Sequence, residues 1–114
     1  MGYFQDAAGN DHGFLFDQGS YTTLDVPGGT GTWAIGINDS GQIVGSYRDA
    51  ANNDRGFLLD QGSYTILYVP GSYGTYAHGI NAAGQIVGYY WDHTGQHGFL
   101  LDNGSYTTLQ GELI

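Results

Sequence analysis

The stretch GINDSGQIVG at residues 36–45 returns as GINAAGQIVG at residues 79–88, which lies 43 positions later. A second stretch, GFLFDQGSYT at residues 13–22, returns in similar form from Gly56 and again from Gly98, at spacings of 43 and 42. Self-similarity at a fixed period of this length is typical of repeat architectures. The repeat unit therefore decides the fold.

The same recurrence divides the chain into units. Residues 2–8 (GYFQDAA) align with residues 45–51 (GSYRDAA), so the sequence enters partway through a unit. We expect a single repeat domain with a partial unit at residues 1–27 and full units at residues 28–70 and 71–114. No segment shows the apolar period of an amphipathic helix.

Each full unit is predicted to form four short strands joined by tight turns. In the middle unit these strands span residues 33–38, 42–47, 56–60 and 64–69. Gly41 supplies a residue that tolerates positive φ in the first turn. Pro70 closes the last strand, because proline cannot extend a ladder. Over the whole chain the pattern predicts about eleven strands and no helix longer than a turn.

The predicted strands are apolar on both sides. Tyr64, Ile66 and Tyr68 share one face of the last strand of the middle unit, whereas Leu67 and Val69 share the other. Strands of this kind suit a sheet that packs between two others, as propeller blades do around their axis. The sequence therefore predicts an all-β chain of β-propeller blades, with a monomeric β-prism or β-trefoil as the alternatives.

Leucines at matching repeat positions are expected to fill the space between these sheets. They are Leu15, Leu24, Leu58, Leu67, Leu100 and Leu109. Small residues in the first strand of the middle unit, Ala34 and Gly36, are expected to allow close packing near the axis.

Charge limits the classes of partner. The formal net charge is −9, and Arg48 and Arg55 are the only lysine or arginine residues. A nucleic-acid partner or an anionic membrane surface would require clustered basic side chains. We therefore expect neither partner. The chain has no cysteine, which excludes a disulfide framework.

The chain resembles the HAF family of probable extracellular bacterial repeats. The resemblance lies in the blocks at residues 36–45 and 79–88, paired with His-x-Phe-Leu blocks at residues 12–15 and 97–100. Glycine stands where the family usually has alanine in the second block, and Arg55 stands in place of its histidine. The resemblance implies an exported, propeller-like repeat protein without an established activity. No signal peptide is recognisable in this chain, so an extracellular location is expected from the resemblance alone.

No cluster of side chains predicts catalysis or metal binding. His12, Arg55 and His97 occupy one repeat position, which therefore requires a polar or cationic side chain instead of a metal ligand. The oxygen-rich loops at residues 6–11 and 49–54 are typical of polar turns and lack a calcium-binding pattern. Catalysis needs a unique constellation, whereas a repeat provides copies. We expect no enzyme, no catalytic residue, no cofactor and no metal.

The candidate ligand-binding residues lie where the units differ. Arg48 and Trp91 occupy one repeat position at the end of a predicted strand, Tyr47 and Tyr90 precede them, and His93 follows in the loop. Aromatic and arginine side chains stack on sugar rings and anchor partner proteins. The alternative is that these aromatic side chains only cover the edge of the sheet.

Three functions follow from this pattern. The preferred one is a non-enzymatic, self-assembling propeller module that binds carbohydrate at its blade edges. The first alternative is a structural, designed or truncated propeller fragment without a ligand. The second is a hydrolase that uses His78 or the loop aspartates.

Self-association follows from the number of units. Fewer than three full blades do not close a ring, because propellers typically contain four to eight. The end blades would expose apolar faces that include Phe14, Phe16, Phe99 and Leu101, or the faces opposite them. We therefore expect a homo-oligomer, with a dimer favoured over a trimer, since two copies supply strands for about six blades. Residues 112–114 are the spare apolar segment that could fill a missing inner strand.

Overall fold

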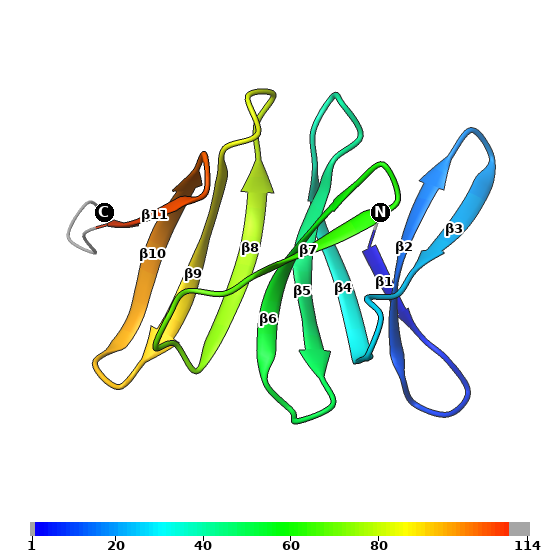
Figure 1. The fold of residues 1–114 in the computed structure, drawn as a ribbon. Helices are drawn as coiled ribbons and strands as arrows, with labels where there is room; N and C mark the ends of the chain where they lie inside the picture. The colour runs from blue at the N-terminus through cyan, green and yellow to red at the C-terminus, as the bar shows by residue number, and fades with distance from the viewer. Residues whose placement is uncertain (1, 110–114) are drawn as a thin grey trace.

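The computed structural model describes residues 2–109, which form eleven β-strands and no helix (Figure 1). The all-β prediction and the predicted number of strands are confirmed. Within residues 2–109, no element has the helical form, length and hydropathy that a helical membrane span requires. Residues 112–114 lie outside the described part of the chain.

The strands form three consecutive antiparallel meanders. The first contains β1 (Gly2–Gln5), β2 (Asp11–Asp17) and β3 (Ser20–Leu24). The second contains β4 (Gly29–Ile37), β5 (Ile43–Asp49), β6 (Asp54–Asp60) and β7 (Ser63–Leu67). The third contains β8 (Gly74–Ile80), β9 (Ile86–Asp92), β10 (Gly95–Asp102) and β11 (Ser105–Leu109). Figure 1 shows them following one another along the molecule from blue to orange-red.

A single parallel pairing between Asp54 and Gly74 joins β6 to β8, so the second and third meanders form one eight-stranded sheet. The first meander is a separate three-stranded sheet. In the described residues neither sheet closes into the barrel that a β-trefoil would require, so that alternative is set aside.

Turn chemistry explains why each meander folds back on itself. Gln61 and Gly62, between β6 and β7, have φ angles of 51° and 83°. Two successive positive φ angles give the type I′ turn, whose twist matches that of the strands it connects. Between β4 and β5, Gly41 has the positive φ that the sequence predicted. The Asn38 side chain also accepts the backbone N–H of Gln42, at 2.9 Å.

Successive meanders pack face on face. For each meander we call the side nearer the N-terminal end of the row of meanders its N-face, and the side nearer the C-terminal end its C-face. In the first core cluster, Leu24 and Val26 on the C-face of the first meander pack against Tyr47 and Phe57 on the N-face of the second. The cluster also includes Ala34, Ile43, Leu15, Leu59 and Tyr64.

The second core cluster repeats this contact one unit later. Leu67 and Val69 on the C-face of the second meander pack against Tyr90 and Phe99 on the N-face of the third. The cluster also includes Val44, Ala77, Ile86, Leu58, Ile80, Leu101 and Tyr106. The chain therefore contains the same meander-to-meander contact twice.

The predicted leucine positions divide into three groups. Leu24 and Leu67 are buried, as expected. Leu15, Leu58 and Leu100 are only partly buried. Leu109 is exposed, because no strand within residues 2–109 packs on the C-face of the third meander. The burial prediction is wrong for Leu109.

The inner strands approach closely, as the small residues predicted. A Cβ atom on Gly36 of β4 would lie 3.0 Å from the backbone oxygen of His78 in β8. The Asn38 amide donates to the backbone oxygen of Asn81, the same repeat position one unit later, at 2.9 Å. A register shift between Ala34 and Gly36 interrupts the simple alternation that the sequence suggested.

Candidate functional site

One repeat position, near the start of β2, β6 and β10, carries a polar or cationic side chain that is bound to an aspartate. The pairs are His12 Nε2 with Asp6 Oδ2 at 2.7 Å, Arg55 Nε with Asp49 Oδ2 at 3.1 Å, and His97 Nε2 with Asp92 Oδ1 at 3.1 Å. Each aspartate opens the loop that precedes its partner's strand. The position therefore fixes a loop, which is the structural role that the sequence indicated.

The loop aspartates are also bound by their own backbone. Asp49 Oδ1 accepts the N–H groups of Ala51 and Asn53, both at 2.9 Å. These bonds, together with the Arg55 guanidinium, hold the pKa of Asp49 below its usual range. Residues 2–109 contain no group of three or more His, Cys, Asp or Glu side chains arranged to hold a metal ion.

His12 lies between two carboxylates. Its Nε2 contacts Asp6 and its Nδ1 contacts Asp25, each at 2.7 Å. Asp6 and then Asp25 raise the pKa of His12, while the hydrogen bond from His12 lowers the pKa of Asp6 to about 2. Because both ring nitrogens are engaged, His12 is placed to hold a loop and not to shuttle a proton.

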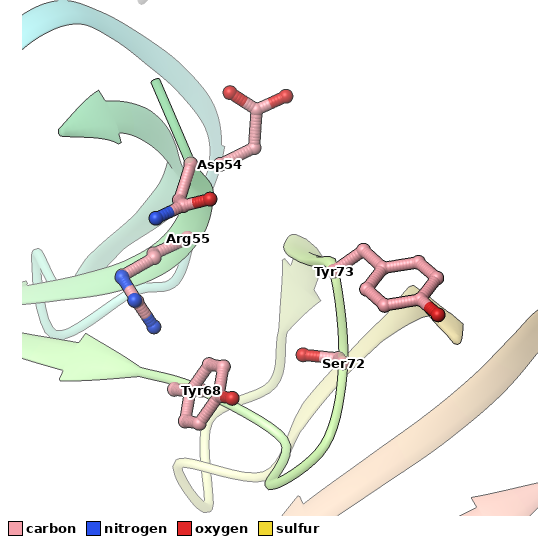
Figure 2. Close-up of a pocket in the computed structure, with 6 residues that line it drawn as sticks. Asp54, Arg55, Tyr68, Ser72 and Tyr73 are labelled. Carbon is pink, nitrogen blue, oxygen red and sulfur yellow. The ribbon is translucent and has the colours of Figure 1, made fainter. Parts of the chain in front are cut away.

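A polar pocket opens between the second and third meanders (Figure 2). It has a volume of about 230 Å³ and is lined by Asn53, Asp54, Arg55, Tyr68, Ser72 and Tyr73. Asn53 ends the loop before β6, Asp54 and Arg55 begin β6, and the last three residues come from the segment between β7 and β8. The pocket therefore lies where an edge loop of one meander meets the connection to the next.

Arg55 is the central group of this pocket. Its guanidinium carbon lies 4.5 Å from the centre of the Tyr68 ring, in a cation–π arrangement. Its Nε is bound to Asp49. Figure 2 shows the guanidinium directed toward Tyr68, with the Ser72 side chain on the facing wall and the Tyr73 ring on the outer side of the loop. Tyr73 is 67 % exposed.

Asp54 connects the second meander to the third. It accepts hydrogen bonds from Arg48 Nε at 2.9 Å and from the Tyr76 hydroxyl at 2.7 Å. Burial, with the Asp54 carboxylate beside the hydroxyl, raises the pKa of Tyr76. One unit earlier, the Trp33 indole N–H donates to Asp11 at 3.1 Å in the same way. The inner strand of each of these meanders is thus tied to an acid of the preceding one.

A second pocket occupies the same repeat position between the first and second meanders. Its volume is about 420 Å³, and its walls include Asp11, His12, Asp25 and Thr30. Asp25 stands in place of Tyr68, and Thr30 in place of Tyr73. The two pockets therefore share a backbone frame, but the later one has gained aromatic walls.

Tyr68 and Tyr73 are site residues that were not predicted from the sequence. The signal was available, because both are aromatic gains at repeat positions where the preceding unit has a polar residue. Their proximity to Arg55 depends on how the segment between β7 and β8 crosses the edge of β6. That crossing is a tertiary feature.

The structure does not bring the sequence-predicted ligand residues together. Tyr47 and Tyr90 are buried in the two core clusters, so their rings pack between meanders and are not open to a sugar. Tyr90 is cross-strand partner to His97, whereas Trp91 is partner to Gln96 on the opposite face of β9. Successive residues of a strand point to opposite faces, and this explains the separation.

Arg48, Trp91 and His93 remain at the surface. Arg48 is half-exposed and paired with Asp54. Trp91 is 44 % exposed on the C-face of the third meander, and His93 is exposed in the turn after β9. Trp91 also lies beside the Arg55 pocket, because its backbone oxygen accepts the N–H of Tyr73 at 2.7 Å.

The N-face of the first meander is open and aromatic. Phe4, Phe14, Tyr21 and Thr23 line an apolar hollow of about 340 Å³. Phe16 extends this surface, with its ring centre 4.5 Å from that of Tyr21. Of the exposed residues that the sequence analysis expected on an end face, Phe16 is exposed and Phe14 partly so.

The C-face of the third meander is open and carries an aliphatic hollow, and Trp91 lies elsewhere on the same face. A hollow of about 370 Å³ there is bordered by Val87, Leu100 and Ile80. Val87 and Leu109 are exposed. Phe99 is fully buried and points to the other face, so the open side of this meander is the one opposite to Phe99.

Comparison with protein-family models and with curated protein sequences finds no match. The resemblance to HAF repeats therefore stays a prediction from the sequence.

Proposed function

We propose that this chain is a non-enzymatic module whose meanders act as β-propeller blades, and that it closes a ring by associating with a second copy. A blade is a four-stranded antiparallel sheet that packs on its neighbours through both faces. The second and third meanders have this strand number and pairing, and the second packs through both of its faces. The first meander contributes three strands in the described residues.

One observation carries the proposal. Val44 and Val87 occupy the same repeat position, yet Val44 is 0 % exposed beneath the third meander and Val87 is 45 % exposed. The side chain has not changed, so only the missing neighbour accounts for the difference. Contiguous exposed apolar surface drives association in water. A second copy supplies the missing neighbour.

The mass in solution tests this proposal. Light scattering behind size exclusion, run from about 1 to about 100 μM, should give a fixed mass that is a small multiple of one 12.2 kDa chain, with twice that mass favoured. A closed ring keeps its mass as concentration rises, whereas an open stack grows. A mass of 12.2 kDa throughout this range would exclude the proposal.

The absence of enzymatic activity is part of the same proposal. His12, the histidine with two carboxylate neighbours, has both ring nitrogens engaged. Within residues 2–109, every buried side-chain nitrogen and oxygen atom has a hydrogen-bond partner, so no buried polar group is held in reserve for a reaction. Hydrolysis of chromogenic esters or glycosides that is lost in His78→Ala would contradict this part.

The Arg55 pocket favours a second function, which is saccharide binding. Its lining includes the Tyr68 and Tyr73 rings, the Arg55 guanidinium and the Asn53 amide, which combine apolar faces with hydrogen-bonding groups, as sugar sites do. Methyl glycosides of glucose, galactose, mannose and N-acetylglucosamine should be titrated while tyrosine and tryptophan fluorescence are followed, because Tyr68 and Tyr73 line the pocket and the backbone oxygen of Trp91 accepts the N–H of Tyr73.

A matched pair of variants locates the response. Tyr73→Ala should abolish a saturable fluorescence change, whereas Thr30→Ala, at the same repeat position one unit earlier, should retain it. A response to none of the four glycosides, or one that survives Tyr73→Ala, would count against saccharide binding at this pocket.

A further inference from the structure

We infer that the aromatic N-face of the first meander docks on the aliphatic C-face of the third meander of a second copy, so that copies join head to tail. This inference rests on the proposed self-association and specifies its surfaces. Its basis is that the chain already contains the contact twice, between consecutive meanders.

The N-face of the first meander matches the two N-faces that are covered inside the chain. Phe14 occupies the position of Phe57 and Phe99, both of which are fully buried. Phe4 occupies the position of Tyr47 and Tyr90, which are also buried. The open face therefore carries an aromatic surface of the kind that a preceding meander covers elsewhere in the molecule.

The C-face of the third meander matches the covering surface. Val87 and Leu109 occupy the positions of Val44 and Leu67, which are buried against the third meander. In both internal contacts an aliphatic C-face lies on an aromatic N-face. Docking between two N-faces would set rings against rings, an arrangement that has no precedent within residues 2–109.

A tyrosine side chain packs into each internal contact. Tyr64 packs against the first core cluster and Tyr106 against the second. Tyr21 occupies the same position in the first meander and is 73 % exposed. In the docked pair, its ring would pack against Leu109 of the other copy, as Tyr64 and Tyr106 pack in the clusters that contain Leu24 and Leu67.

Gln96 on the C-face of the third meander, which stands where the earlier units have an aspartate, is compatible with docking on the first meander of a second copy. Asp11 and Asp54 each accept a hydrogen bond from the inner strand of the next meander. The first meander has no inner strand in the described residues, so it offers no counterpart of Trp33 or Tyr76. At the corresponding position the third meander carries the neutral Gln96, which leaves no carboxylate to be buried without that donor.

Single charges on the two faces test whether both are needed. Tyr21→Glu and Val87→Glu should each raise the dissociation constant of the assembly at least tenfold, because each would bury a carboxylate in the contact. Ile66→Glu is the matched control: Ile66 is 44 % exposed, like Val87, but lies on neither open face. Far-ultraviolet circular dichroism checks that every variant keeps its strands. Association that persists in either face variant would overturn the inference.

Cysteine trapping then shows which face meets which. The chain has no cysteine, so Tyr21→Cys and Leu109→Cys introduce single thiols. When the two variants are mixed and oxidised, the mixed disulfide should form faster than either self-pair and faster than the control mixture of Ile66→Cys with Leu109→Cys. A dominant Tyr21→Cys self-pair, or a mixed pair no faster than the control, overturns head-to-tail docking even if the parent associates. A parent of single-chain mass overturns both this inference and the proposed function.

Discussion

Val44→Ala and Val87→Ala make the same chemical change at the same repeat position, but a neighbouring meander buries Val44, whereas Val87 is exposed. Val44 lies in β5, fully buried between the second and third meanders. Val87 lies in β9 on the open C-face of the third meander, where 45 % of its surface is exposed. The difference between the losses in unfolding free energy of the two variants therefore measures how much a packed neighbouring meander stabilises this valine.

The magnitudes follow from the burial. Each buried methyl or methylene group contributes about 0.8 kcal/mol, and a closed cavity adds to the loss. Val44→Ala should therefore lower the free energy of unfolding by about 2–3 kcal/mol. At Val87 only part of the side chain is covered and water fills the vacated space, so the loss should be about 0.5–1 kcal/mol.

Urea unfolding followed by circular dichroism measures both losses, at a protein concentration where light scattering gives the mass of a single chain. The urea dependence of the unfolding free energy should match the parent, which confirms that only stability has changed. Equal losses of unfolding free energy for the two variants would refute the claim that the neighbouring meander stabilises Val44 by burying it. At concentrations where the parent associates, Val87→Ala should also weaken association by about tenfold, because the docked copy now covers that position.

Three further predictions concern charge and backbone space. Raising sodium chloride from about 20 to about 500 mM should tighten association, because it screens the repulsion between copies that each carry a net charge of −9; weaker association would indicate ion pairing instead. Asp6 raises the pKa of His12, so the contribution of His12 to stability is complete below pH 6.5 and is lost as pH rises through the folded pKa. The pKa of Asp6 is lowered, so the contribution of Asp6 to stability is present above pH 3.8 and is lost as pH falls toward about 2. An NMR titration should place the midpoint of His12 above 6.5, and a midpoint below that value would contradict the pairing. Gly45→Ala should destabilise by about 1–3 kcal/mol, because its Cβ would collide with the backbone oxygen of Trp33, whereas Gly79→Ala has room and should change little in urea unfolding.

The features that the sequence predicted well are local ones. The strands and their turns follow from short patterns, such as the Gln61-Gly62 pair and the glycine at position 41, which need no knowledge of distant residues. The two-sided burial of the middle unit also follows, because alternating side chains of one strand must both find cover. Repetition strengthened each of these signals, since the same pattern occurs independently in every unit.

The sequence could not show how one meander is placed on the next. The grouping of Tyr90 and Trp91 on one surface was an avoidable error, because neighbours in one strand point to opposite faces, as these two do in β9. Tyr76 reaches Asp54 at the point where Gly74 of β8 pairs with β6, and a Cβ atom on Gly74 would lie 3.0 Å from the Tyr76 hydroxyl. Such contacts depend on how one meander is placed on the next, and composition carries no record of that placement.

The distribution of charge favours association through the ends of the molecule. Most of the acids lie at the ends of strands or in the turns beside them, as Asp49 and Asp60 do at the ends of β5 and β6, and the side chains that line the hollows of the two open faces are uncharged. An acidic rim of this kind opposes side-by-side contact between copies at every orientation. The uncharged ends lose the least electrostatic energy and gain the most from excluding water. Because aromatic rings line the hollow at one end and aliphatic side chains line the hollow at the other, the same surfaces that attract the copies also set their direction.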